Sequence, residues 1–219
     1  MLSWSRRALL LGAVLAAGPL AAPTVSADQP QEQRFETELM PVPHDPAKDA
    51  GSHATGESKL KLTGTELAVK FRAEDVTPGL NHLVHIHGET QARNECPDSL
   101  AWDTDGDGLI SVGEGAADVS STQLGYGPVQ VSFTREGDVS ADSGGALARM
   151  PMADADGEVR YKRTFALPSP VPSGSPEDIA GHLDDMAMVI HGHDLDGDGA
   201  YSNSTEASLP LACGEIVAD

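Results

Sequence analysis

The sequence predicts an all-β domain, an antiparallel sandwich or barrel of short strands. Three observations lead to this prediction: several short segments alternate apolar and polar residues, turn residues separate them, and little of the chain repeats apolar residues with the period of a helix. Aromatic residues make up only 4% of the chain, but alternating valine, leucine and isoleucine are sufficient for a modest β core. We therefore expect one β domain.

The expected strands follow one another along most of the chain. The first, 35–42, lies in an otherwise polar N-terminal segment, 28–58. A Thr63-Gly64 turn joins the next two strands in a hairpin, and a Pro78-Gly79 turn precedes the fourth. The main β domain, 59–219, contains the strands expected at 59–64, 66–76, 78–88, 128–134, 158–167, 186–192 and 211–217.

Residues 1–27 are predicted to be a signal peptide. A basic start with Arg6 and Arg7 precedes an apolar stretch, which ends in small residues at 25–27. The two arginines leave two forms open, a twin-arginine signal for proteins exported in the folded state and an ordinary secretory signal. Either form predicts a secreted or extracytoplasmic protein that begins at Asp28. No other apolar run approaches 18 residues, so we expect no membrane span after the signal is removed.

The chain is strongly acidic, and this limits its partners. Removal of the signal would leave 12 basic against 34 acidic residues and change the formal charge from -20 to -22. Such a surface repels nucleic acid and attracts cations, so we expect metal ions as partners and no nucleic acid. The sequence identifies no protein partner. The two cysteines, Cys96 and Cys213, favour a disulfide in an exported protein.

Residues 103–114, DTDGDGLISVGE, follow the pattern of a calcium-binding loop. Acidic residues stand at positions 1, 3 and 5, glycine at 6 and glutamate at 12, and Gly108 permits the sharp turn that wraps the loop around one ion. The flanking sequences are poorly helical, so we expect a structural calcium ion without the helix pair of an EF-hand sensor. The predicted ligands are Asp103, Asp105, Asp107, the carbonyl of Leu109, Ser111 and Glu114.

A second acidic loop, 194–206, repeats the first half of this pattern. Position 12 is Thr205, and the glutamate arrives one residue late. We expect either a weaker calcium site or a plain turn. The candidate ligands are Asp194, Asp196, Asp198 and Glu206.

Two histidine-rich segments contain candidate ligands for a transition metal. In HLVHIHGE, 82–89, side chains of an extended strand alternate between its faces, so His85 and His87 point the same way and His82 points the opposite way. His44 and His53 lie in a polar loop and are expected to be solvated.

The second segment is MVIHGHD, 188–194, in which His191 ends an apolar strand and His193 follows on the same expected face. Imidazoles on neighbouring strands suit Cu(II) or Zn(II). The alternative is that the histidines hydrogen-bond loops at the rim of the barrel. The candidate metal ligands are His85, His87, His191 and His193.

These motifs resemble those of the copper/zinc superoxide dismutase family. In that family a strand similar to HGFHVHEFG supplies two copper ligands, a cysteine follows nine residues later, a VVIH strand supplies a third ligand, and a strand similar to RLACGVI carries the partner cysteine. His85 and His87 match the first pair, Cys96 the first cysteine, His191 the third ligand and Cys213 the partner. The resemblance implies a Greek-key β sandwich of the superoxide dismutase type, copper at the three histidines and a Cys96–Cys213 disulfide.

The resemblance covers about residues 59–217, and the chain departs from it at the zinc site and at the substrate-guiding arginine. No histidine lies between Pro97 and Gly181, so the bridging histidine and the zinc ligands are missing and zinc is not expected. The acidic loop 103–114 occupies the stretch of the family's zinc loop. Pro210 stands where the family has the arginine that guides superoxide, while His82 matches a histidine of structural role.

The segment 66–88 is also similar to chordin-type domains, in which a HIHG strand occurs without an established enzymatic role. We therefore expect an exported metal-binding domain with little or no catalytic activity and assign no catalytic residue. Two alternatives stay open. One is a zinc-free copper superoxide dismutase, and the other is a calcium-stabilised structural domain of the chordin type.

Overall fold

The computed structural model describes residues 31–48, 53–88, 95–116, 125–135, 147–167 and 179–219, so the predicted signal peptide lies outside the described residues. The described chain is mostly antiparallel β structure, which confirms the predicted all-β class. None of its described helices is long and apolar enough to cross a membrane. The strands are β1 Glu32–Pro41, β2 Thr55–Thr63, β3 Glu66–Glu74, β4 Leu83–His87, β5 Val129–Ser132, β6 Val159–Ala166, β7 Ala187–His191, β8 Pro210–Glu215 and β9 Val217–Ala218. The helices are α1 Val112–Gly115 and α2 Ser204–Ser208, with single 3-10 turns at Leu100–Trp102, Leu147–Arg149, Ile179–Gly181 and Leu183–Asp185.

Several strands begin or end away from their expected limits. β2 begins at Thr55 rather than at 59, and β1 begins at Glu32 rather than at 35, because both strands extend further into the polar segment. The segment 78–88 forms a strand only as β4, and Asn81 makes an isolated bridge to Met152. The last predicted strand is divided into β8 and the short β9.

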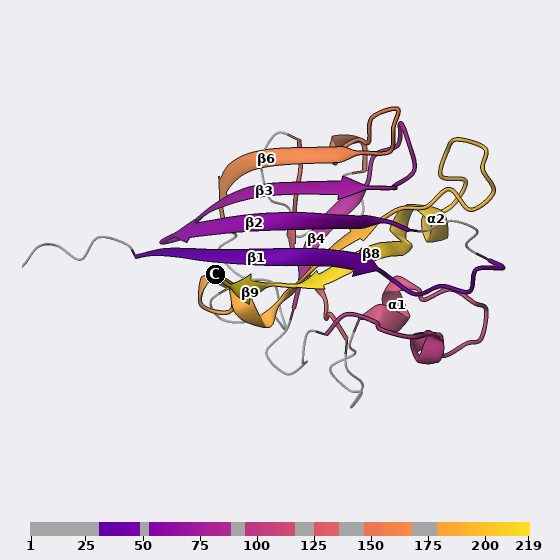
Figure 1. Ribbon diagram of the computed structural model, residues 1–219, viewed down its shortest axis with the longest axis horizontal. Coiled ribbons are helices and arrows are strands. Elements are labelled where there is room, and N and C mark those ends of the chain that lie inside the picture. The colour runs from indigo at the N-terminus through magenta and orange to yellow at the C-terminus, as the bar shows by residue number, and fades with distance from the viewer. Residues whose placement is uncertain (1–30, 49–52, 89–94, 117–124, 136–146, 168–178) are drawn as a thin grey trace, which may run out of the picture.

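The strands form one curled sheet in the order β5-β4-β7-β8-β1-β2-β3-β6, with β9 beside β1. β1 joins the half of the sheet formed by β2, β3 and β6 to the half formed by β5, β4, β7 and β8. Most of β1 pairs with β2, while its last residues, Met40 and Pro41, pair with β8. Figure 1 shows β1, β2, β3 and β6 side by side, in front of β4 and β8. The two ends of the order approach each other, since Tyr161 Oη on β6 donates to the carbonyl of Thr134, just after β5, at 2.9 Å.

The main core fills the inside of the curl. Its stacked rings, Phe71, Phe133 and Tyr161, have centroids 5.1 to 6.2 Å apart. β4 contributes Val84 and Ile86 to this core. Since side chains alternate along a strand, His85 and His87 on the same strand point to its other side.

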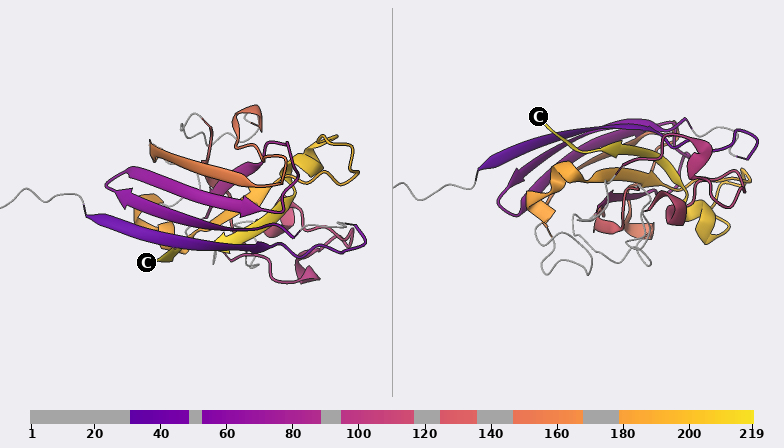
Figure 2. Two further views of the ribbon diagram at one scale, coloured as in Figure 1. Left: turned by 45° about the horizontal axis from the view of Figure 1, so that its top comes forward. Right: turned by 90° about the horizontal axis from the view of Figure 1, so that it is seen from below.

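A smaller cluster covers that other side of β4, β7 and β8. In this cluster, apolar residues of the segment 102–116 and Tyr126 pack against the strands. The disulfide between Cys96 and Cys213 ties the beginning of this cover to β8 and confirms the predicted bond. Figure 2 shows the strands curving over short helices and connecting segments that gather on one side. The buried members of the cluster are Val42, Ile110, Tyr126, Ala187, Val189 and Cys213.

Candidate metal centre

Three histidines meet on the covered side of β4 and β7. His85 and His87 come from β4, and His191 ends β7, which pairs antiparallel with β4. The three ring centroids lie 5.1 to 5.5 Å apart, and one nitrogen from each ring lies within 4.8 Å of the others. The three side chains are buried, with exposed fractions of 3% for His85 and 1% for His87 and His191. The structure therefore brings together three of the four predicted transition-metal ligands.

Hydrogen bonds to the backbone orient two of these rings. His87 Nδ1 lies 2.8 Å from the carbonyl oxygen of Gly127, and His191 Nδ1 lies 2.9 Å from that of Ser208. Because a carbonyl only accepts, both Nδ1 atoms carry the proton, and in the neutral rings both Nε2 atoms are bare acceptors. These two Nε2 atoms face each other at 3.3 Å.

Among the described residues, neither ring nitrogen of His85 has a hydrogen-bond partner. A buried polar group without a partner is costly, and native proteins rarely keep one without a reason. His85 contacts the other two rings. The centre thus brings one nitrogen from each of three imidazoles within 4.8 Å of the others, and three imidazoles are a donor set that a transition-metal ion takes.

The surroundings keep the three rings neutral. Burial lowers the pKa of His87 to about 3 and that of His191 to about 4, and it lowers the pKa of His85 well below the ordinary value. The neighbouring histidines lower the pKa of His85 and His87 further. At neutral pH, therefore, no proton is available to bridge the facing nitrogens, and the lone pairs are free for a metal.

His193, the fourth candidate histidine, is not in this group. β7 ends at His191, and Gly192 has a φ of +107°, so the alternation of a strand does not continue to His193. His193 N instead donates to the carbonyl of Glu206 at 2.8 Å.

Two further histidines have structural roles. His82 Nε2 donates to the carbonyl of Thr77 at 3.0 Å, and its Nδ1, the acceptor nitrogen of the neutral ring, lies 3.4 Å from Tyr201 Oη. His44 corrects the expectation of a solvated loop residue, since it is 9% exposed. His44 Nδ1 accepts from Ile110 N at 3.0 Å, and its Nε2 bonds the carbonyl of Pro210 at 2.7 Å. This imidazole joins the acidic loop to β8, and no motif in the sequence marks it.

A tyrosine that the sequence did not single out lies against the centre. The ring of Tyr126 meets the edge of His87 with centroids 4.7 Å apart, and Tyr126 is fully buried. Its backbone N donates to the carbonyl of Gly115 at 3.0 Å. A Cβ at Gly115 would collide with the tyrosine ring, so glycine permits this contact. α1 thereby contacts Tyr126, which packs on the candidate ligand His87.

The first acidic loop brings three of its predicted ligands together, Asp103, Asp105 and Glu114. Glu114 Oε2 accepts from the backbone N of Ser111 at 2.9 Å and its Oε1 accepts from that of Thr104 at 2.7 Å, and these bonds lower the pKa of Glu114 to about 2. Within the described residues, the loop is preceded by the single 3-10 turn Leu100–Trp102 and ends in the short helix α1, while most of the C-terminal flank lies outside the described residues.

Other predicted ligands of this loop have local roles. Asp107 is not in the carboxylate group; its Oδ1 accepts from Leu109 N at 2.8 Å. Ser111 Oγ accepts from Glu114 N and caps α1.

The second loop brings Asp194, Asp196 and Glu206 together, although its spacing is irregular. The short helix α2 brings Glu206 to the two aspartates despite this spacing. Asn203 caps the helix, and Glu206 lies in its first turn and is only 2% exposed. Asp198 is not in this group. The same helix carries Ser208, whose carbonyl orients His191.

Comparison with known proteins finds no family model that matches this chain and no curated protein that matches it.

Proposed function

We propose that this chain is an exported metal-binding domain of the superoxide dismutase type that holds one copper ion at His85, His87 and His191. One observation carries the proposal: the bare Nε2 atoms of His87 and His191 face each other at 3.3 Å beside His85, whose ring nitrogens have no hydrogen-bond partner in the described part of the chain. A cation between the rings would satisfy all three nitrogens.

Copper is the metal that best suits these ligands. Imidazole binds copper, zinc, iron and nickel, and among the divalent ions of the first transition row Cu(II) binds such sites most tightly. The resemblance of the motifs to the copper ligands of superoxide dismutases supports the same ion. Bound copper would supply one-electron redox chemistry.

Calcium is the proposed ion of the two acidic loops, because carboxylate oxygens suit this hard cation. The three carboxylates of the first loop are Asp103, Asp105 and Glu114, and those of the second are Asp194, Asp196 and Glu206. We assign calcium a structural role. The first loop packs beside the histidines through Ile110, and the second continues into α2, which orients His191.

We propose little or no catalysis of superoxide turnover. Pro210 occupies the position of the family's guiding arginine, and it is buried in β8 with its carbonyl bonded to His44. The three histidine side chains are buried, and the chain has a formal charge of -20, which repels an anionic substrate.

The test is an electron paramagnetic resonance titration of the protein with one equivalent of Cu(II), calcium present, beside His191→Ala and His193→Ala. We expect a signal with nitrogen hyperfine structure in the wild type and in His193→Ala, and its loss in His191→Ala. Circular dichroism checks that His191→Ala is folded. Equal signals in His191→Ala and wild type would refute the site and favour a calcium-stabilised structural domain.

The copper-loaded protein is then assayed for superoxide turnover. Turnover well above that of the same amount of free copper would contradict the proposed weak catalysis and identify a zinc-free copper superoxide dismutase.

A further inference from the structure

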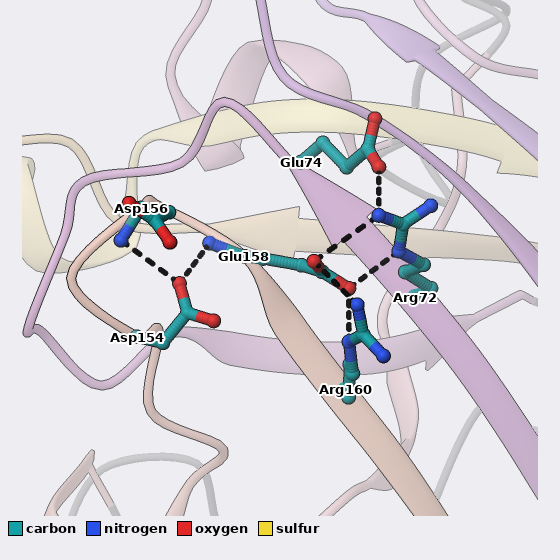
Figure 3. Close-up of polar contacts among 6 residues, drawn as sticks. All are labelled: Arg72, Glu74, Asp154, Asp156, Glu158 and Arg160. Atoms are coloured by element: carbon teal, nitrogen blue, oxygen red, sulfur yellow. Dashed lines mark hydrogen bonds and ion pairs between the residues drawn. The ribbon is translucent and has the colours of Figure 1, made fainter.

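Charged side chains around Glu158 satisfy one another on the surface of the sheet. Figure 3 shows Glu158 between Arg72 and Arg160, while Glu74 pairs with Arg72 as well. In the same view, Asp154 Oδ1 accepts from the backbone N of Glu158 at 2.9 Å. The polar groups of this surface cluster therefore have partners.

Several buried polar atoms differ, because they lack a partner and are concentrated at the metal centre. In the described part of the chain, seven buried side-chain nitrogen and oxygen atoms have no hydrogen-bond partner. Four of them belong to His85, Ser132 and Gln130, which lie on the neighbouring strands β4 and β5. Each buried group of this kind is costly, so their concentration here requires an explanation beyond the fold.

A metal ion accounts for only one of the two nitrogens of His85. A neutral imidazole has one nitrogen with a free lone pair and one that carries the proton. When the first binds the ion, the second is a buried N–H donor that needs an acceptor. For His87 and His191 the acceptors are the carbonyls of Gly127 and Ser208. Within the described residues, no carbonyl has this role for His85.

Ser132 is the polar residue that lies directly opposite His85. The register of β4 and β5 pairs the two residues, and Phe133 N donates to the carbonyl of Val84 at 3.0 Å. Hydrogen-bonded and non-hydrogen-bonded pairs alternate along an antiparallel ladder, so His85 and Ser132 form a pair of the second kind, whose side chains approach more closely. Val131 and Phe133 lie in the main core, so Ser132 points to the other side of the sheet, as His85 does.

We propose that Ser132 is a positioning residue of the metal centre, whose hydroxyl oxygen accepts the N–H of His85 when the other ring nitrogen binds the ion. Ser132 is fully buried, and its hydroxyl has no partner among the described residues. The hydrogen bond forms directly after a rotation about the Cα–Cβ bond of the serine, or through one buried water between the two groups. Either bond fixes the plane of the ring and makes the ligating nitrogen more basic. This role rests on the proposed function, because it concerns His85 as a ligand.

The experiment measures the affinity for Cu(II) by competition with a chelator, with calcium present, in the whole protein and in the variants Ser132→Ala, Ser132→Thr and Ser58→Ala. Ser58→Ala is the matched control. Ser58 is 2% exposed, its hydroxyl also has no partner in the described chain, and it lies on β2, which carries none of the three histidines. Both alanine variants therefore lose one buried, unpartnered hydroxyl. Circular dichroism checks that all variants are folded.

We expect Ser132→Ala to bind copper about 10–100-fold more weakly than the wild type, because the ring of His85 is no longer held. Its electron paramagnetic resonance spectrum should show altered nitrogen hyperfine structure. Ser132→Thr keeps the hydroxyl, so it and Ser58→Ala should keep the wild-type spectrum and lose less than about tenfold in affinity.

A second measurement observes the N–H of His85 itself. Cu(I) is diamagnetic, so nuclear magnetic resonance of the Cu(I)-loaded, nitrogen-15-labelled protein detects this buried proton. Ser132→Ala should move its resonance upfield, because the proton loses its acceptor. Ser58→Ala should leave the resonance where it is in the wild type.

The outcomes separate this role from the copper site. Wild-type affinity and spectra in Ser132→Ala would overturn the role of Ser132 and leave the copper site intact. An equal loss in Ser58→Ala, or a loss in Ser132→Thr as large as that in Ser132→Ala, would also overturn it, since the hydroxyl beside His85 would not be the determinant. Absence of copper binding by the wild-type protein would instead refute the proposed function together with this role.

Discussion

The Nε2 atoms of His87 and His191 face each other at 3.3 Å, although the Nδ1 atoms of both rings are already committed to carbonyl oxygens. Two such acceptors repel each other unless a cation lies between them. A proton is a poor candidate at neutral pH, because burial lowers the pKa of both rings to about 3 and about 4. The arrangement is thus unfavourable in the metal-free protein and favourable around a metal ion.

The variant His85→Leu tests whether the histidine site lowers the stability of the metal-free protein while it serves to bind copper. The imidazole of His85 makes no hydrogen bond to any residue that the structure describes, so its replacement by an apolar side chain of similar size removes an unsatisfied buried group. We expect the metal-free variant to be as stable as the wild type or more stable by about 1–3 kcal/mol, and to have lost copper binding.

Urea unfolding in the presence of a chelator measures the free energy of unfolding, and a copper titration measures binding. His53→Leu, at an exposed position, is the control and should keep both properties. Copper binding retained by His85→Leu would contradict the assignment of this ligand.

The stability of the metal-free protein should fall as the pH decreases from 7.5 to 5.5. In the unfolded chain a histidine takes up a proton near pH 6.5, whereas folded His87 and His191 stay neutral down to about pH 3 and about pH 4. The unfolded state therefore binds more protons in this range, and acid favours unfolding. The expected loss approaches about 1.4 kcal/mol per pH unit for each histidine.

Chelator-treated protein is unfolded with urea at several pH values across this range, which lies above the titration of most carboxylates. His191→Phe should show a shallower decrease than the wild type, while His53→Gln should follow the wild type. A stability that does not change with pH would show that the rings are accessible to protons in the folded state.

Part of the fold could be predicted from the sequence, because β1, β2, β3 and β6 alternate an exposed polar face with a buried apolar face. The same alternation correctly placed His85 and His87 on one face, and the two cysteines correctly indicated the disulfide. The alternation does not extend to His193, because β7 ends at His191 and the positive φ of Gly192 changes the direction of the chain.

Other parts of the centre have no signal in the sequence. The carbonyls of Gly127 and Ser208 orient two ligands, but every residue has a carbonyl, and only the fold decides which one meets an imidazole. The burial of His44 likewise depends on β8 and the acidic loop, which are far from it along the chain. In the second acidic loop, α2 compensates for the irregular spacing of Glu206.

Glu114→Gln should weaken calcium binding at the first acidic loop. Glu114 lies in one group with Asp103 and Asp105, and replacement of its carboxylate removes a charge that calcium requires. Wild-type protein should gain about 2.7 kcal/mol of stability for each site that binds calcium when the free ion is at 100 times its dissociation constant. Glu114→Gln should lose one such contribution.

Calorimetric titration with calcium and thermal unfolding with and without the ion measure these effects. Glu66→Gln, an exposed change at the start of β3, is the matched control and should respond as the wild type. An unchanged calcium response in Glu114→Gln would mean that the loop is a turn and not an ion site.

Tyr126 transmits the position of α1 to the histidines by packing rather than by its hydroxyl group. The Oη atom lies 3.5 Å from the carbonyl of Val112, which is a long contact, whereas the ring meets His87 edge-on. Tyr126→Phe should therefore keep the copper spectrum and cost at most about 1.5 kcal/mol of stability. Tyr126→Ala should cost about 3–5 kcal/mol and alter the copper spectrum, because the cavity releases the ring of His87.

Gly115→Ala tests the same contact from the opposite side, since its new methyl group must displace the ring of Tyr126 toward other atoms. Overpacking of this kind costs about 1–3 kcal/mol. Copper titrations followed by electron paramagnetic resonance, together with urea unfolding, compare the three variants. If Tyr126→Phe changed the copper spectrum as much as Tyr126→Ala did, the hydroxyl group rather than the ring would be the part that holds His87 in place.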